Sequence, residues 1–156
     1  MRLLRGKGED LVFSLHKREV AVLRAVLGRY PCVPPGQQRL SRSMEGEDAE
    51  ENQSLLDEAM AAMREENKQR LATFLDEPGR FEELKERCRF KLTPAEADWL
   101  LQVLNDVRVG CWIRLGAPDF EAGVRVDLNE ETAPHLWVME AAGHFESCLL
   151  EALGGE

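Results

Sequence analysis

The chain lacks the sequence features that mark most membrane proteins, metal sites and nucleotide-dependent enzymes. No apolar run in its 156 residues approaches the ~18 residues of a membrane-spanning helix, and the run Leu11–Leu15 is too short for a secretory signal. The phosphate-binding P-loop, the dinucleotide-binding GxGxxG, the hydrolase GxSxG and the zinc-binding HExxH patterns are all missing. These absences predict no membrane association, no cofactor and no metal, and they make a binding protein a better expectation than an enzyme.

Cysteines are few and far apart in the sequence. Cys32, Cys88, Cys111 and Cys148 form no CxxC pair, which argues against a zinc knuckle and a thioredoxin-type redox pair. Cys111 and Cys148 fall on apolar helical faces and are expected to pack as small hydrophobic residues. Cys88 stands between two arginines, but alternation along a strand turns its thiol inward and both arginines outward, so activation is not expected. A reduced, cytoplasmic chain is the simplest interpretation.

Charge is unevenly distributed, although the net charge is −9. Residues 1–44 contain nine Lys or Arg against three Asp or Glu, a balance of +6. The remaining 112 residues contain 11 against 26, a balance of −15. The acidic total argues against nucleic-acid binding. The basic first part is expected to meet the acidic part of the same chain, with an acidic partner as the alternative.

Hydrophobic periodicity predicts a single α+β domain over residues 1–156 that is mostly helical. Four main helices are expected to pack on one side of a small sheet of about three short strands. A Pro/Gly/acidic stretch at about 31–51 is expected to form a flexible linker or loop. One or two further helical turns are expected over 81–87. The predicted strands are 11–15, 88–92 and 124–128, and the predicted helices are about 17–29, 54–77, 93–116 and 130–153.

Two helix starts have recognisable end signals. Thr93, Pro94 and Glu96 form a capping box with proline at the first helical position, which makes this the best-defined boundary in the chain. For the last helix, Asn129 can serve as the N-cap, or Pro134 can mark the first turn instead.

Two strand–helix units resemble each other at a constant offset of 77 residues. The matched positions of the first unit are Phe13, Leu15, Glu19, Leu23, Val26 and Leu27, and those of the second are Phe90, Leu92, Glu96, Leu100, Val103 and Leu104. Duplication explains these matches, but any strand followed by a capped amphipathic helix would also produce them.

Four polar residues interrupt the apolar helix predicted at 93–116: Asn105, Asp106, Arg108 and Arg114. A helix that is apolar on nearly every side is expected to be buried, and buried polar groups are costly unless paired. In the structural interpretation Arg108 pairs with a carboxylate, and Asn105 bonds backbone or Asn67. In the functional interpretation the four residues line a cleft that binds a carboxylate, a phosphate or the backbone of a partner.

The run LNDVR at 104–108, followed by RLG at 114–116, resembles the signature of a bacterial family, the domain-of-unknown-function family number two thousand and seventeen, commonest in actinobacteria. Its similarity covers about two-thirds of the chain, and best the stretches 11–27 and 90–116. The resemblance implies a strand leading into a helix with an early glutamate and no assigned activity, so no catalytic role is carried over. It also implies a protein-handling context, because members are often encoded near a Clp protease adaptor.

We therefore expect a non-catalytic module that binds a protein partner or self-associates, for example as a homodimer. Trp99, Trp112 and Trp137 are candidate interface residues, although core packing is expected for at least two of them. The alternative is a small-ligand-binding protein or enzyme that uses the polar cluster around Arg108. Glu140 and His144 have a spacing that can bind metal, but they are better explained as the solvated side of a helix.

Overall fold

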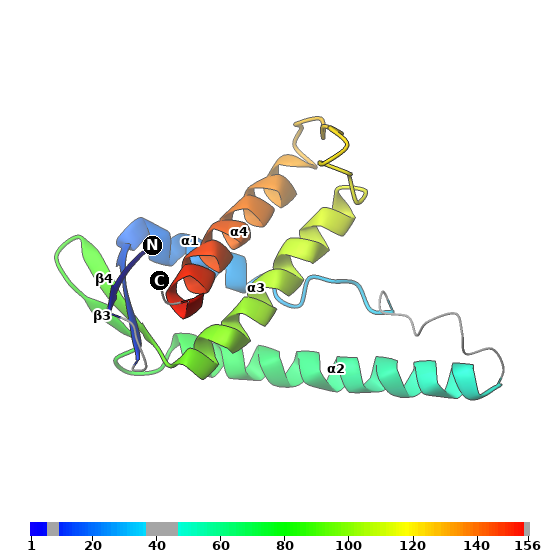
Figure 1. Ribbon diagram of the computed structural model, residues 1–156, viewed down its shortest axis with the longest axis horizontal. Coiled ribbons are helices and arrows are strands. Elements are labelled where there is room, and N and C mark those ends of the chain that lie inside the picture. The colour runs from blue at the N-terminus through cyan, green and yellow to red at the C-terminus, as the bar shows by residue number, and fades with distance from the viewer. Residues whose placement is uncertain (6–9, 37–46, 155–156) are drawn as a thin grey trace.

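The computed structural model describes residues 1–5, 10–36 and 47–154, and within these ranges it contains four helices and four strands (Figure 1). This confirms the predicted mostly helical α+β fold, with four strands where about three were expected. No helix in these ranges is both long enough and apolar enough to cross a membrane. The elements in order are β1 (Arg2–Arg5), β2 (Leu11–His16), α1 (Lys17–Leu27), α2 (Glu47–Leu75), β3 (Phe81–Glu83), β4 (Arg87–Leu92), α3 (Pro94–Arg114) and α4 (Ala133–Gly154).

The sheet is antiparallel throughout, with strand order β1-β2-β4-β3. Its central strands alternate between apolar and polar residues, so one face is buried and carries Phe13 and Phe90, both fully inaccessible. The other face carries exposed side chains such as Arg89 and Lys91. Helices α1, α3 and α4 lie on the buried side, as expected for a two-layer fold (Figure 1).

Two sequence predictions about strands were wrong. The stretch 81–87 was expected to be helical, but it forms β3 and the turn into β4, with the Phe81 ring stacked on Phe90 at 4.7 Å between centroids. The stretch 124–128 was expected to be a strand, but it belongs to the loop before α4, where Leu128 is 76% exposed. Alternating apolar residues make a strand only where a neighbouring edge supplies hydrogen bonds.

Helix α2 begins at Glu47, so the predicted linker at 31–51 extends too far at its C-terminal end. The part of that linker at 37–46 lies outside the described residues. Among the α2 side chains whose burial is described, the buried ones are Leu71 and Phe74 near the C-terminal end, whereas Leu55 and Met63 are exposed. Figure 1 shows the N-terminal half of α2 extending away from the other helices. Its Glu, Ala, Leu and Met content explains how it is helical with little packing.

The starts of α3 and α4 test the two predictions about helix caps. Thr93 Oγ1 accepts a hydrogen bond from the Glu96 amide at 3.1 Å, and a Glu96 carboxylate oxygen accepts one from the Thr93 amide at 2.8 Å, which confirms the capping box. For α4, Asn129 Oδ1 accepts from the amides of Glu131 and Thr132 in the preceding turn. Helix α4 itself begins at Ala133 with Pro134 in its first turn, so the second alternative was right.

The two similar strand–helix units are arranged about a local two-fold axis. Phe13 and Phe90, which match at the offset of 77, are direct partners in the β2–β4 ladder. Each unit gains an outer strand, β1 or β3, at opposite edges of the sheet. The matched sequence positions therefore occupy matched structural positions, whereas duplication as their origin stays a prediction.

The two matched glutamates, Glu19 and Glu96, each bind a cation from the start of the outer strand. Glu19 contacts the amino group of Met1 and accepts a hydrogen bond from the His16 amide at 2.6 Å. Glu96 forms two hydrogen bonds with the Arg80 guanidinium, at 2.5 and 2.8 Å. Each capping carboxylate thus ties a helix start to its own outer strand.

Replacing Glu96 with glutamine is predicted to give a pH-dependent loss of stability. Burial acts to raise the pKa of the Glu96 carboxyl, but hydrogen bonds from Arg80 and Thr93 outweigh burial and lower the pKa below its usual value. A lowered folded-state pKa contributes stability above the unfolded-state pKa, and this stability is lost as pH falls through the folded-state pKa. We expect Glu96→Gln to lose about 1–3 kcal/mol at pH 7 in urea unfolding. The loss should shrink below about pH 4, and a loss independent of pH would contradict the assignment.

Candidate functional site

Helix α3 lies at the centre of the helical layer, but it is not enclosed on every side. Its buried residues are Ala97, Trp99, Leu100, Val103, Leu104, Val107, Gly110 and Cys111. Gln102, Asn105, Arg108 and Trp112 form an exposed stripe. The prediction of a helix buried all round was therefore wrong on this side, because α2 and α3 diverge along their lengths (Figure 1).

Asp106 binds the backbone of the segment that follows α1. One carboxylate oxygen accepts hydrogen bonds from the amides of Cys32, at 2.6 Å, and Val33, at 3.2 Å. These residues follow the cis peptide bond between Tyr30 and Pro31. A carboxylate on α3 therefore satisfies two amides that no regular secondary structure pairs.

Arg114 binds the same residue from the other side. Its Nη1 donates to the carbonyl oxygen of Cys32 at 2.6 Å, to the Sγ of Cys32 at 3.1 Å and to the carbonyl oxygen of Gly110 at 3.2 Å. The guanidinium thus connects the segment around Cys32 to the last turns of α3, at helix positions where the backbone carbonyls carry partial negative charge.

Gly110 lets the backbone of Cys32 lie directly against α3. A Cβ atom at position 110 would lie 2.4 Å from the carbonyl carbon and 2.6 Å from the carbonyl oxygen of Cys32, far inside contact distance. Asp106, Gly110 and Arg114 are spaced four residues apart on one helical stripe. We call these three residues and Cys111 the Cys32 clamp.

The clamp changes the acidity of the two thiols. The Sγ atoms of Cys32 and Cys111 are 4.0 Å apart and both residues are buried. A hydrogen bond from the Cys111 thiol, opposed by burial and aided by the charge of Arg114, lowers the pKa of Cys32 to about 7. The same contact and burial raise the pKa of Cys111 above its usual value. Cys32 is therefore the more acidic thiol of the pair.

Sequence reasoning missed this thiol because it looked for activating residues next to each cysteine in the sequence. Arg114 is 82 positions from Cys32. The prediction for Cys88 stands, since its side chain points inward and burial raises the pKa of its thiol. Cys111 is buried as expected, but its contact with Cys32 makes it more than a small hydrophobic residue.

Arg108 and Asn105 lie on a different side of α3 from Asp106 and Arg114, so the four predicted site residues form two groups. Arg108 Nε binds a carboxylate oxygen of Glu146 on α4 at 2.9 Å, and Nη2 reaches the Asn105 side-chain oxygen at 3.4 Å. The structural prediction that Arg108 pairs with a carboxylate is confirmed. Glu146, which is only 11% exposed, was not predicted from the sequence, although it interrupts the buried face of α4.

Asn67 was a suggested partner of Asn105, and this was wrong. The Asn67 side-chain amide instead donates to the Tyr30 hydroxyl at 3.2 Å and its oxygen accepts from Trp99 Nε1 at 2.9 Å. Asn67 therefore joins α2 to α3 and to Tyr30 in the segment after α1.

A groove of about 800 Å³ runs between α3 and α4 beside the Arg108–Glu146 ion pair. We call it the α3–α4 groove. Several of its large apolar side chains are exposed, among them Trp112 at 37%, Phe120 at 45% and Leu150 at 57%. Its lining residues are Arg108, Val109, Trp112, Phe120, Met139, Glu140, Gly143, His144, Glu146, Ser147 and Leu150.

Trp99 is buried in the core, with its ring 5.2 Å from Phe74 in an edge arrangement, whereas Trp112 and Trp137 are exposed. The expectation that at least two of the three tryptophans pack in the core was therefore wrong. Trp112 Nε1 donates to the Pro118 carbonyl oxygen at 2.9 Å, and Trp112 is one of the residues that line the groove.

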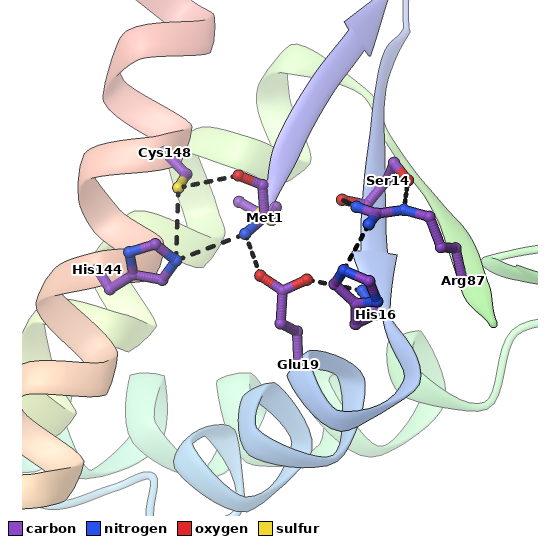
Figure 2. A network of polar contacts seen from close by, with 7 residues as sticks. All are labelled: Met1, Ser14, His16, Glu19, Arg87, His144 and Cys148. Atoms are coloured by element: carbon purple, nitrogen blue, oxygen red, sulfur yellow. Dashed lines mark hydrogen bonds and ion pairs between the residues drawn. The ribbon is translucent and has the colours of Figure 1, made fainter.

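Figure 2 shows a second polar cluster, where β1 and α1 approach α4. The Met1 amino group contacts Glu19 and lies 3.5 Å from His144 Nε2, which in turn lies 3.9 Å from Cys148 Sγ. Burial raises the pKa of the Cys148 thiol, so this cysteine is poorly suited to act as a nucleophile. In the part of the chain that the structure describes, no three metal-ligating side chains come together.

Comparisons with protein-family models, with curated proteins and with solved structures gave no match.

Two helical glycines provide a direct test of the clamp. At Gly110 an added methyl group collides with the Cys32 backbone, whereas at Gly143 it meets only Arg108 Cδ at 3.8 Å. We expect Gly110→Ala to lower the free energy of unfolding by about 1–3 kcal/mol, as overpacking does. Gly143→Ala should raise it by about 0.4–1 kcal/mol, because alanine restricts the unfolded chain. Urea titrations of both variants would refute the close contact if Gly110→Ala were as stable as Gly143→Ala.

The Arg108–Glu146 pair should make stability depend on pH. Burial raises the pKa of the Glu146 carboxyl, and the charge of Arg108 counteracts part of this rise. A raised pKa means that stability falls as pH rises from the ordinary carboxyl range through the folded-state pKa.

Arg108→Met removes the counteracting charge, so we expect a loss of about 1–2 kcal/mol at pH 7. This is less than for a fully buried pair, because Arg108 is 49% exposed. The loss should disappear near pH 4. Arg125→Met, in the exposed loop, is the control, and an equal loss at both pH values would contradict the role of Arg108.

Proposed function

We propose that this protein is a non-catalytic binding module and that its α3–α4 groove holds an apolar helical segment of a protein partner. One observation carries the proposal. Asp106, Arg108 and Arg114 on α3 are engaged by neighbouring protein groups, while large apolar residues are exposed in the groove beside Arg108.

The groove has the composition of a protein interface. Trp112, Phe120 and Leu150 supply large apolar contacts, and tryptophan is enriched among residues that dominate binding energy. Charged side chains such as Glu140 and Arg108 line the same groove, which fits a polar rim around an apolar centre. Helices α3 and α4 run side by side in opposite directions (Figure 1), and the groove lies between Arg108–Trp112 of α3 and Met139–Leu150 of α4. A shape of this kind suits an amphipathic helix with apolar residues at i, i+3 or i+4, and i+7.

The family resemblance contributes the biological context of the proposal, namely a partner in protein handling such as a Clp-dependent system. A second copy of this chain is the alternative occupant, which corresponds to a homodimer. A small-ligand function is the second candidate, because Arg108 is half exposed and lines the groove. A carboxylate ligand would bind its guanidinium.

A matched pair of leucine variants tests the groove. Leu150→Glu places a charge in the groove, whereas Leu128→Glu places one at a residue that is 76% exposed in the loop before α4. A partner protein should bind the wild-type chain and the Leu128→Glu variant with similar affinity. It should bind the Leu150→Glu variant at least tenfold more weakly, since a carboxylate that is buried without a partner group is costly. Binding that survives Leu150→Glu would contradict the proposal.

Sedimentation of the same three proteins identifies the occupant. A wild-type dimer that becomes monomeric only with Leu150→Glu makes the second copy the occupant of the groove. A monomer whose partner binding is lost in the same variant supports a separate partner. If neither partner binding nor self-association depends on Leu150, the small-ligand function replaces the protein-binding function as the leading candidate.

A further inference from the structure

Two thiols from distant parts of the chain meet in the Cys32 clamp. Cys32 lies in the segment after α1 and Cys111 lies on α3, 79 positions further on, with their sulfur atoms 4.0 Å apart. Cys88 lies on β4 and Cys148 on α4, and the hydrogen bonds of their thiols go to groups other than cysteine. The chain therefore contains one candidate thiol pair and two built-in controls.

We propose that Cys32 and Cys111 are a redox site that forms a reversible disulfide when the protein meets a peroxide. Bond formation requires the sulfur atoms to approach from 4.0 Å to about 2.05 Å. Rotation about the Cα–Cβ bonds of two short side chains can supply such a displacement while the backbone of Cys32 stays in the clamp.

The clamp holds Cys32 in a fixed position for this reaction. Asp106 binds its amide, Arg114 binds its carbonyl oxygen and Gly110 lies against its backbone. The position of the Cys32 residue is thus set by three contacts that do not involve its thiol. The effective concentration of Cys111 beside it is correspondingly high.

Arg114 assigns different roles to the two sulfur atoms. Its Nη1 lies 3.1 Å from Cys32 Sγ and stabilises negative charge there. The contact with Cys111 and the charge of Arg114 lower the pKa of Cys32, while the same contact and burial raise the pKa of Cys111. Cys32 is therefore the sulfur that attacks an oxidant, and Cys111 is the sulfur that resolves the product.

The reaction balances with hydrogen peroxide as the two-electron oxidant. The Cys32 thiolate attacks one peroxide oxygen, the O–O bond breaks, and the leaving hydroxide takes a proton to become water. The resulting sulfenic acid at Cys32 is attacked by the sulfur of Cys111 as that thiol loses its proton. The S–S bond forms and the sulfenic oxygen leaves as a second water. An external dithiol reverses the process by exchange and is itself oxidised to a disulfide.

The disulfide would fasten the segment around Cys32 to α3 covalently. Asp106 and Arg114 now hold that segment with hydrogen bonds alone. Tyr30 and Val33 from the same segment line a cleft of about 470 Å³ between α2 and α3, together with Met60, Met63 and other residues. Oxidation would therefore fix one wall of this cleft.

Limited oxidation of the whole reduced protein tests the site. The protein is treated with one equivalent of hydrogen peroxide at pH 7, and free thiols are then alkylated and the digest is mapped by mass spectrometry. We expect the peptides that contain Cys32 and Cys111 to be cross-linked to each other. Cys88 and Cys148 should remain free thiols after oxidation and should therefore be found alkylated. Cys32 should react roughly tenfold faster than Cys148, since its thiolate fraction is larger. Dithiothreitol should restore all four thiols.

Three variants separate the roles of the residues. Cys111→Ser should leave a sulfenic acid at Cys32 that a dimedone probe traps, and Cys148→Ser should oxidise as the wild type does. Arg114→Gln should shift the pH profile of Cys32 alkylation to higher pH. If Arg114→Gln fails to fold, the wild-type pH profile measured with iodoacetamide decides, and a midpoint at or above pH 8.5 would overturn the proposal.

Unfolded protein provides the last control. In urea the cross-link between Cys32 and Cys111 should lose its preference over other pairings, because the clamp is absent. Faster oxidation of Cys88 or Cys148 in the folded protein, or an equal yield of the same cross-link in urea, would each overturn the proposal.

Discussion

The structure depends on the need to satisfy charged groups on a central helix that is otherwise apolar. Asp106, Arg108 and Arg114 lie on α3 beside core residues, although Arg108 and Arg114 are themselves exposed, and the buried groups that they bind would be costly to leave unpaired. Each binds a group outside α3. Asp106 and Arg114 hold the segment after α1, and Arg108 holds α4 through Glu146. The ion pairs and hydrogen bonds of α3 therefore decide which segments pack against it and in what register.

Two sides of helix α3 then have separate uses. One side, at Gly110 and Cys111, is in close contact with Cys32, whose thiol has the lowered pKa. The other side, at Arg108 and Trp112, lines the α3–α4 groove with exposed apolar surface. Cys111 and Trp112 are adjacent residues, so a covalent change at the clamp would occur one residue from the groove.

The sheet combines local symmetry with chemical asymmetry. Phe13 and Phe90 meet at the local two-fold axis, and Glu19 and Glu96 cap the two helices at matched positions. The cation bound by the first glutamate is an amino group, and that bound by the second is a guanidinium. Helix α3 also extends well beyond the length of α1. The added turns of α3 carry both the Cys32 clamp and part of the groove, which explains why these sites occur in one unit only.

Local patterns in the sequence determined those elements whose physical cause is local. The capping box at Thr93 and the alternation of β2 and β4 act over a few residues, and both were predicted correctly. Predictions failed where an element needed a distant partner. The alternation at 124–128 met no neighbouring strand, whereas Phe81 found the edge of β4 and formed a strand instead of a helix.

The candidate sites divide in the same way. Sequence singled out Asp106, Arg108 and Arg114, because charges within an apolar helix are visible in one dimension. Their partners Cys32 and Glu146 were decided by tertiary structure alone. The acidity of a thiol and the shape of a groove depend on distances in space, and no local pattern encodes a contact across 82 positions of the chain.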